Sequence, residues 1–199
     1  MLARSGARLG CRALGRQQAG FNLIEVMVAV AVLAIGLLGI AALQIQGVRY
    51  NYGSLSRSQA VLTANDFAER LYANRLGARA GNYSGLDSNA VNCATAPAQI
   101  CARQSNQATP AVCNAAQMAT YDRYVVSCGF PTSTGRYGGV RDLLTGGRIQ
   151  VTCVNAADVA GACAANPFHR ILVTWQERVT GANNQTTLQT VNFRMVVQP

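Results

Sequence analysis

The sequence predicts an α+β protein in which one long N-terminal helix packs against a C-terminal antiparallel sheet. Two observations predict this plan. Apolar residues run without a charge from Val26 to Leu43 and then recur at helical spacing as far as Leu71, whereas the apolar residues of the C-terminal part alternate with a period of two. The two periods occupy separate parts of the chain, which is the α+β arrangement with the sheet packed on the helix.

The predicted helix covers residues 21–76, and its first part, residues 21–45, is apolar enough to be transmembrane. At ~1.5 Å per residue the apolar stretch spans roughly 34 Å, more than the ~30 Å of a bilayer core. The second part has one apolar face and carries Asp66 and Arg70 four residues apart, in the favourable order for an ion pair. We therefore expect the second part to lie on a globular domain.

Residues 1–20 are predicted to be a basic leader. They hold four arginines and no acidic residue, and a basic stretch before an apolar run places the N-terminus in the cytoplasm and the rest across the membrane. The apolar run is too long for a secretory signal, whose apolar region has about 7–15 residues. Glu25 lies at its edge, where an unpaired acid costs ~2.5–3.5 kcal/mol, so we expect this carboxylate to have a partner.

Residues 77–120 are predicted to be a polar, cysteine-containing connector, and residues 121–199 the antiparallel sheet of the exported domain. The connector contains two prolines and many Ala, Asn and Gln residues, which is typical of a loop. Trp175 is expected to face the core. The strand candidates are Tyr121–Cys128, Arg148–Asn155, Ile171–Trp175 and Val191–Val197.

The cysteines predict disulfides. Cys11 lies in the leader, and six cysteines remain, an even number in a segment expected to face an oxidising compartment. Six cysteines allow fifteen pairings. The short loop favours a Cys153–Cys163 pair, and Cys93–Cys101 is our second choice. The candidates for up to three disulfides are Cys93, Cys101, Cys113, Cys128, Cys153 and Cys163.

Few residues are suited to catalysis or metal binding. The chain has a single histidine and no Cys-x-x-Cys pair, which argues against a Cys/His zinc site and against a Ser-His-Asp site. We expect His169 at a surface or capping position, and we expect no catalytic residue, metal or cofactor. No motif groups basic and aromatic residues, so no direct nucleic-acid site is evident.

The segment from Gly20 to Glu25, Gly-Phe-Asn-Leu-Ile-Glu, resembles the prepilin cleavage signature of type IV pilins and type II secretion pseudopilins. In that family a prepilin peptidase cuts after the glycine, the new N-terminal Phe is N-methylated, and a glutamate follows at the fifth mature position. The resemblance implies cleavage between Gly20 and Phe21, N-methylation of Phe21, and an assembly-register role for Glu25. Asn22 stands where the family more often has threonine.

Residues 31–44 (AVLAIGLLGIAALQ) and 62–75 (LTANDFAERLYANR) resemble the PilV-type minor pilin of the type IV pilus. The resemblance implies a pilin fold and a structural subunit, not an enzyme. Such a subunit joins other minor pilins, primes pilus assembly near the tip, and supports twitching motility, adhesion or DNA uptake through the pilus.

The implied partners are the prepilin peptidase, other minor pilins, the major pilin, the inner-membrane assembly platform and inner-membrane lipid. The implied location is a single pass through the inner membrane, with the N-terminus cytoplasmic and the C-terminal domain periplasmic. From there the protein enters the pilus at the cell surface.

Two other functions are compatible with parts of the sequence. A minor pseudopilin of type II secretion would share the leader, and only the Gly-Leu-Leu-Gly stretch and residues 62–75 argue against it. A membrane-anchored periplasmic enzyme or binding module would keep its leader and would need an active-site cluster, which the sequence does not offer.

Overall fold

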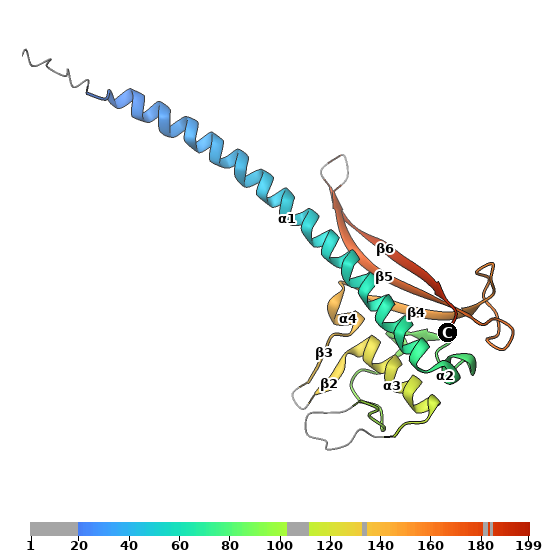
Figure 1. The fold of residues 1–199 in the computed structure, drawn as a ribbon. Helices are drawn as coiled ribbons and strands as arrows, with labels where there is room; N and C mark the ends of the chain where they lie inside the picture. Colours follow the sequence, from blue (N-terminus) through green and yellow to red (C-terminus); the bar gives the residue numbers. More distant parts are fainter. Residues whose placement is uncertain (1–19, 103–111, 133–134, 181–182, 184) are drawn as a thin grey trace, which may run out of the picture. The chain divides into compact units, whose positions relative to one another are not determined.

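A computed structural model describes residues 20–102, 112–132, 135–180, 183 and 185–199. The chain divides into two compact units, residues 1–48 and residues 49–199, and helix α1 contributes to both. Figure 1 shows the elements along the chain. In order they are α1 (Leu23–Ala73), α2 (Arg75–Arg79), β1 (Leu86–Asp87), the 3-10 helix η1 (Ser88–Ala90), α3 (Ala115–Cys128), β2 (Phe130–Thr132), β3 (Gly135–Tyr137), α4 (Val140–Leu143), β4 (Arg148–Val154), β5 (Phe168–Thr180) and β6 (Thr186–Val197).

In the first unit, α1 is an apolar helix without a buried face. Every residue from 20 to 48 is exposed, and by length and composition the helix can cross a membrane. A helix that is apolar all round requires an apolar environment, which is either lipid or the helices of other proteins. The helix begins at Leu23, two residues after the predicted start, because the Asn22 carbonyl accepts the first hydrogen bond, from the amide of Glu25 at 2.9 Å.

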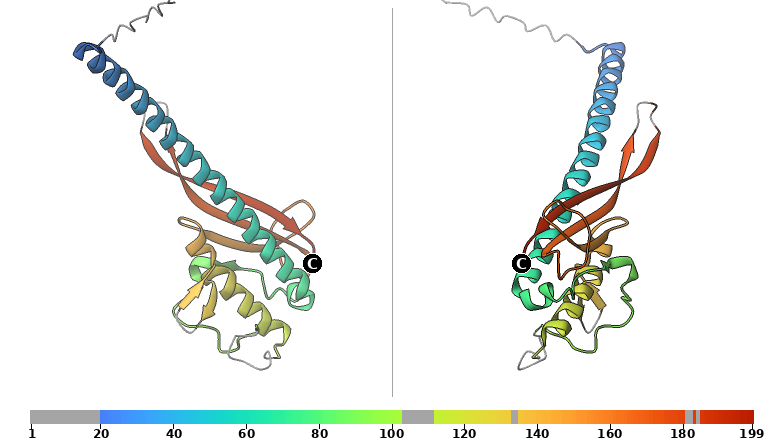
Figure 2. Two further views of the ribbon diagram at one scale, coloured as in Figure 1. Left: turned by 60° about the vertical axis from the view of Figure 1, so that its left-hand side comes forward. Right: turned by 90° about the vertical axis from the view of Figure 1, so that its right-hand side faces the viewer.

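In the second unit, the end of α1 packs on one face of an antiparallel sheet, as both views of Figure 2 show. The strand order is β1-β4-β5-β6. Phe67 and Leu71 of α1 are fully buried in one cluster with Ile149, Val173 and Trp175 of the sheet. The predicted α+β fold is confirmed, and so is the core position of Trp175, which is 2% exposed.

The C-terminal end of α1 differs from the prediction. The helix ends at Ala73 instead of continuing to residue 76, and α2 starts at Arg75. Asn74 leaves the helical conformation and caps α2 by accepting a hydrogen bond from the amide of Gly77 at 3.2 Å. Its side-chain amide also donates to the Ala115 carbonyl at 2.7 Å, so the break fastens the end of α1 to the start of α3.

The predicted strand Tyr121–Cys128 is wrong, because these residues form the second half of α3. The helix starts with a capping box in which Asn114 and Gln117 bond each other's backbone amides. Nearly every residue of the segment is buried, so the pattern of apolar residues shows no period that separates a helix from a strand. The fourth strand of the sheet is instead β1, from within the predicted connector, which pairs with β4.

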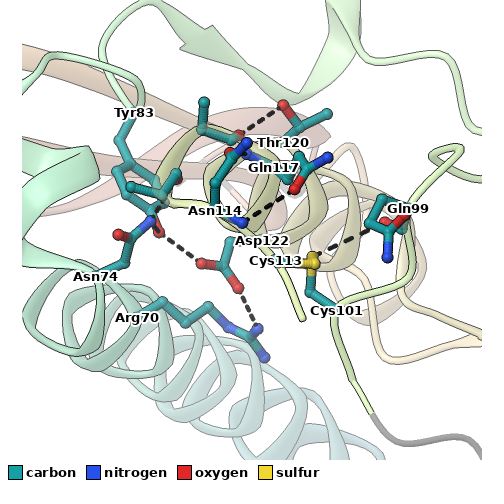
Figure 3. The surroundings of a disulfide bond; sticks show 12 residues. Arg70, Asn74, Tyr83, Gln99, Cys101, Cys113, Asn114, Gln117, Thr120 and Asp122 are labelled. Carbon is teal, nitrogen blue, oxygen red and sulfur yellow. Dashed lines mark hydrogen bonds and ion pairs between the residues drawn. A yellow bond between two sulfur atoms is a disulfide. The ribbon is translucent and has the colours of Figure 1, made fainter. Parts of the chain in front are cut away.

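The six cysteines form three disulfides. The favoured pair Cys153–Cys163 is confirmed, whereas Cys93–Cys101 is wrong. Cys93 pairs with Cys128 at the end of α3, and Cys101 pairs with Cys113 just before α3 (Figure 3). The first disulfide thus fastens the polar connector to α3, and the second closes a loop within the connector. The sequence did not reveal the first pair because the end of α3 was predicted as a strand.

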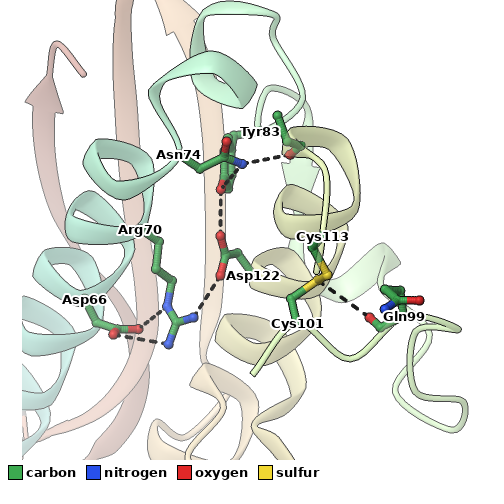
Figure 4. A network of polar contacts seen from close by, with 9 residues as sticks. Asp66, Arg70, Asn74, Tyr83, Gln99, Cys101, Cys113 and Asp122 are labelled. Carbon is green, nitrogen blue, oxygen red and sulfur yellow. Dashed lines mark hydrogen bonds and ion pairs between the residues drawn. A yellow bond between two sulfur atoms is a disulfide. The ribbon is translucent and has the colours of Figure 1, made fainter. Parts of the chain in front are cut away.

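A buried polar network joins α1, α3 and the segment between α2 and β1 (Figure 4). Arg70 of α1 donates from Nη1 to Asp122 of α3 at 2.9 Å, and it donates from Nε to Asp66 at 2.9 Å, the pair expected from the sequence. The Tyr83 hydroxyl donates to the other oxygen of Asp122 at 2.6 Å. In turn, the side chain of Asn74 donates to the Tyr83 hydroxyl at 3.0 Å, so the network reaches the break after α1.

Burial and the charged partners together set the pKa values of this network. It raises the pKa of Asp122, although the hydrogen bonds from Tyr83 and Arg70 act in the opposite direction. Burial, together with the hydrogen bond to Asp122, raises the pKa of Tyr83. For Arg70, burial alone would lower the pKa, but the two aspartates outweigh it and the pKa rises. Arg70 therefore stays charged, and its charge depends on Asp122 for compensation inside the protein.

Arg70 allows a comparison of its two acidic partners. Asp122 has a side chain that is 5% exposed and Asp66 one that is 51% exposed. We expect Asp122→Ala to lower the free energy of unfolding by ~3–5 kcal/mol, since Arg70 loses its buried partner and keeps only the exposed Asp66, and the Tyr83 hydroxyl loses its acceptor. We expect Asp66→Ala to cost less than about 1 kcal/mol. Denaturant unfolding followed by the fluorescence of Trp175, the single tryptophan, measures both. Equal losses would contradict the role assigned to Asp122.

The disulfides predict a thiol count. We expect the mature chain, made in an oxidising compartment, to show no reactive thiol under denaturing, non-reducing conditions, and the uncleaved precursor to show one, Cys11. Closing loops of these lengths is worth about 3–4 kcal/mol each in the chain-entropy model, so reduction should also lower the melting temperature. Thiol titration is the assay. Two or more reactive thiols in the mature chain would show that the pairing is wrong.

Candidate functional site at the start of the long helix

The predicted cleavage junction lies in an exposed, non-helical segment. Gly20, Phe21 and Asn22 precede the first turn of α1, and the Phe21 side chain is 83% exposed. A protease needs an accessible peptide that is not held in a helix, and the bond between Gly20 and Phe21 meets both conditions. The leader residues 1–19 lie outside the described residues.

The fold itself does not require glycine at residue 20. A Cβ built on Gly20 meets no heavy atom within 4 Å. The same is true of Gly36 and Gly39 in the apolar part of α1. A glycine inside a helix costs about 0.5–1 kcal/mol relative to alanine, and the described chain offers no compensating contact at these positions. These glycines are instead suited to contacts with other molecules, such as a peptidase at Gly20 and closely packed helices at Gly36 and Gly39.

Glu25 is the only charged residue between positions 20 and 48. It lies in the first turn of α1, where the helix dipole favours a negative charge. The ion pairs of the described residues all lie beyond residue 56, and none of them involves Glu25. Within the described part of the chain, Glu25 is therefore a carboxylate without an ionic partner at the start of an exposed apolar surface.

The expected position of His169 is wrong. Its side chain is buried, 1% exposed, and it lies opposite Cys153 in the pairing of β4 with β5. Its Nε2 is 3.6 Å from the Cys153 sulfur, which belongs to a disulfide. The alternation of β5 could have revealed this, because His169 has the same parity as the inward-facing Ile171 and Val173. Burial lowers the pKa of His169, so the imidazole is neutral at pH 7.

The described residues do not assemble a metal site. They contain no group of three or more His, Cys, Asp and Glu side chains placed to hold a metal ion. The six cysteines 93, 101, 113, 128, 153 and 163 are all oxidised. Asp122 and Tyr83 are buried and are hydrogen-bonded to each other. Within the described part of the chain, the N-terminal segment instead combines exposed apolar side chains with the carboxylate of Glu25, which has no ionic partner there.

Comparison with known families agrees with this location of the site. Residues 15–41 match the family model described as the prokaryotic N-terminal methylation motif, and residues 42–124 match the family described as Type IV pilin Tt1218. Searches of curated proteins and of solved structures gave no significant match. The two family matches adjoin, and together they extend from the leader into α3. The chain therefore has an N-terminal segment similar to the prokaryotic methylation motif, followed by a region similar to a type IV pilin family.

Proposed function

We propose that this protein is a minor subunit of the type IV pilus that is processed by prepilin peptidase and inserted into the fibre through α1. One observation carries the proposal: residues 20–48 form an exposed apolar surface with a single carboxylate at its start. Such a surface is stable in lipid before assembly and among the helices of other subunits after it. The methylation motif and the pilin domain support the same function, which is structural and not enzymatic.

The carboxylate of Glu25 sets the height at which one subunit aligns with its neighbour in the fibre. Cleavage after Gly20 creates an amine on Phe21, four residues before Glu25. In an environment of low dielectric constant the attraction between the two charges is several-fold stronger than in water, although desolvation limits the net gain. The amine of one subunit and the carboxylate of a neighbour meet at only one relative height, so the pair selects the position at which a subunit is added.

The proposed location follows from charge and redox chemistry. The four arginines of the leader favour a cytoplasmic N-terminus, so the pilin domain lies in the periplasm until it enters the pilus. Three disulfides support this location, because disulfides persist in oxidising compartments.

The minor role is supported by the likeness of residues 31–44 and 62–75 to PilV-type minor pilins. In this role the protein joins other minor pilins and the assembly platform, primes the fibre near its tip, and affects motility, adhesion or DNA uptake through the pilus. A minor pseudopilin of type II secretion is the alternative, since it carries the same N-terminal motif.

Deletion of the gene distinguishes the two assignments. For a minor pilin we expect few surface pili with normal secretion, and we expect wild-type sheared pili to contain far fewer copies of this protein than of the major pilin. Normal piliation combined with retention of secreted enzymes in the periplasm would support the pseudopilin instead.

The first prediction from this proposal concerns the N-terminus. We expect the mature chain to begin at N-methylated Phe21, as measured by mass spectrometry of the native protein. Gly20→Leu should leave the precursor uncut in the membrane, because the fold has room for a side chain there and only the peptidase should reject it. Gly36→Ala, at an equally open position, is the control and should be processed normally. A native N-terminus at Met1 or beyond residue 43 would refute the assignment.

The second prediction concerns Glu25. We expect Glu25→Gln and Glu25→Ala to be inserted and cut normally but to enter pili poorly, because the amine of a neighbouring subunit loses its partner. Glu25→Asp keeps the charge and should retain part of the incorporation, and Val26→Ala is the control for a neighbouring change without loss of charge. The ratio of the protein in sheared pili to that in membranes measures the effect. Wild-type ratios for both uncharged variants would exclude the register role.

A further inference from the structure

The face of the sheet turned away from α1 carries arginines from three different strands, and Arg148, Arg170 and Arg194 lie in three adjacent rows of it. The inward residues of β4, β5 and β6 pack on α1, and the alternate residues face outward. The pairing aligns these outward residues in three rows across the strands. The rows are Arg148–Thr174–Asn192, Gln150–Leu172–Arg194 and Thr152–Arg170–Val196.

Leu172 lies at the centre of this array, and the three arginines surround it together with amide and hydroxyl side chains. Six residues of the array line a shallow depression of about 460 Å³; they are Gln150, Thr152, Arg170, Leu172, Asn192 and Arg194. At the usual spacings of a sheet the array measures ~10 Å across the strands and ~13 Å along them. A depression of this size matches two to three linked sugar rings.

The arginines are held in position by an ordered loop. Asp158, in the loop between β4 and β5, forms salt bridges with Arg170 at 3.4 Å and with Arg194 at 2.8 Å. Asn155 accepts hydrogen bonds from two amides of this loop, and the Cys153–Cys163 disulfide fastens it to β4. Asp158 thus orients two guanidinium groups before any ligand arrives.

The arginines keep donors available for a ligand. A guanidinium has five N–H donors, and the salt bridge from Arg194 to Asp158 uses Nη1. The Arg194 side chain is 60% exposed, so the remainder of its guanidinium faces solvent. Arg148 is paired with Asp87 and is 37% exposed. These three arginines and their two partners outside the array, Asp87 and Asp158, together carry one net positive charge.

We propose that this face, called here the arginine array (residues 148, 150, 152, 170, 172, 174, 192, 194 and 196), binds an acidic oligosaccharide whose carboxylates are spaced one to a sugar. Arginine binds a carboxylate through paired hydrogen bonds. The amides of Gln150 and Asn192 and the hydroxyl of Thr152 can bond sugar hydroxyls, and Leu172 offers an apolar surface to the face of a ring.

The composition of the array favours this ligand over a nucleic acid. Duplex DNA carries one charge per ~1.7 Å, and its binding is dominated by neutralisation of many phosphates. One net charge is too few for that mode. Single-stranded nucleic acids are held by stacking on aromatic side chains, and the nine outward positions of the array include no aromatic residue. A sparsely charged polymer with many hydroxyls is the better complement.

The test is calorimetric titration of the full processed protein in detergent with a hexamer of galacturonate. The matched ligand is the fully methyl-esterified hexamer, which has the same length and no charge, and a third ligand is a short DNA duplex. The double variant Arg170→Gln/Arg194→Gln removes two charges from the array. Its control is Arg75→Gln/Arg79→Gln, which removes two charges from the exposed side chains of α2. Leu172→Glu is the second variant, because its outward side chain lies outside the core.

We expect the galacturonate hexamer to bind and the esterified hexamer to bind at least about ten-fold more weakly. The double array variant and Leu172→Glu should each weaken galacturonate binding by about ten-fold or more, and the control by less than about two-fold. Leu172→Glu decides the test if the double variant loses its folded Trp175 fluorescence. Equal binding of the two hexamers, equal losses in array and control variants, or tighter binding of the duplex with the same loss in the array variants would each overturn the proposal.

Discussion

The structure depends on apolar surface that the protein cannot bury by itself. Residues 23–48 of α1 are exposed over their whole circumference, whereas later in the same helix Phe67 and Leu71 are fully buried against the sheet. The two parts of this helix therefore need different surroundings. The sheet covers the C-terminal part, but the described chain offers nothing that covers the apolar N-terminal part. That cover must come from lipid or from other subunits, so the exposed apolar segment leads to the function in the same way that a buried core leads to a fold.

Several polar contacts and disulfides stabilise the globular domain around the C-terminal end of α1. The Asp122 carboxylate links α1 to α3 through Arg70, and Asn74 fastens the end of α1 to the start of α3. Disulfides join the polar connector to α3 and the β4–β5 loop to the sheet. These contacts fasten the C-terminal end of α1 to the rest of the second unit.

The sequence predicts those parts of the molecule in which one physical signal dominates. The uninterrupted apolar run and its basic leader predicted α1, and simple alternation predicted β4, β5 and β6 together with the buried Trp175.

Prediction failed where burial extends all round an element: residues 121–128 are buried on almost every side, so their apolar pattern fits a strand as well as a helix. The capping box at Asn114 and Gln117 is the local signal that could have indicated the helix. His169 was misplaced because the parity of β5 was not extended two residues back from Ile171. The Cys93–Cys128 pair was missed since its formation depends on α3, whereas the Cys153–Cys163 pair closes a short local loop.

The central claim is that the exposed part of α1 contacts other pilin helices in the assembled fibre. Photo-crosslinking from a single benzoyl-phenylalanine introduced at Leu37, between Gly36 and Gly39, tests this most directly. Intact pili should yield a covalent adduct with the N-terminal helix of another subunit, and the adduct should disappear with Glu25→Gln. The absence of subunit adducts in purified pili that contain the protein would contradict the account.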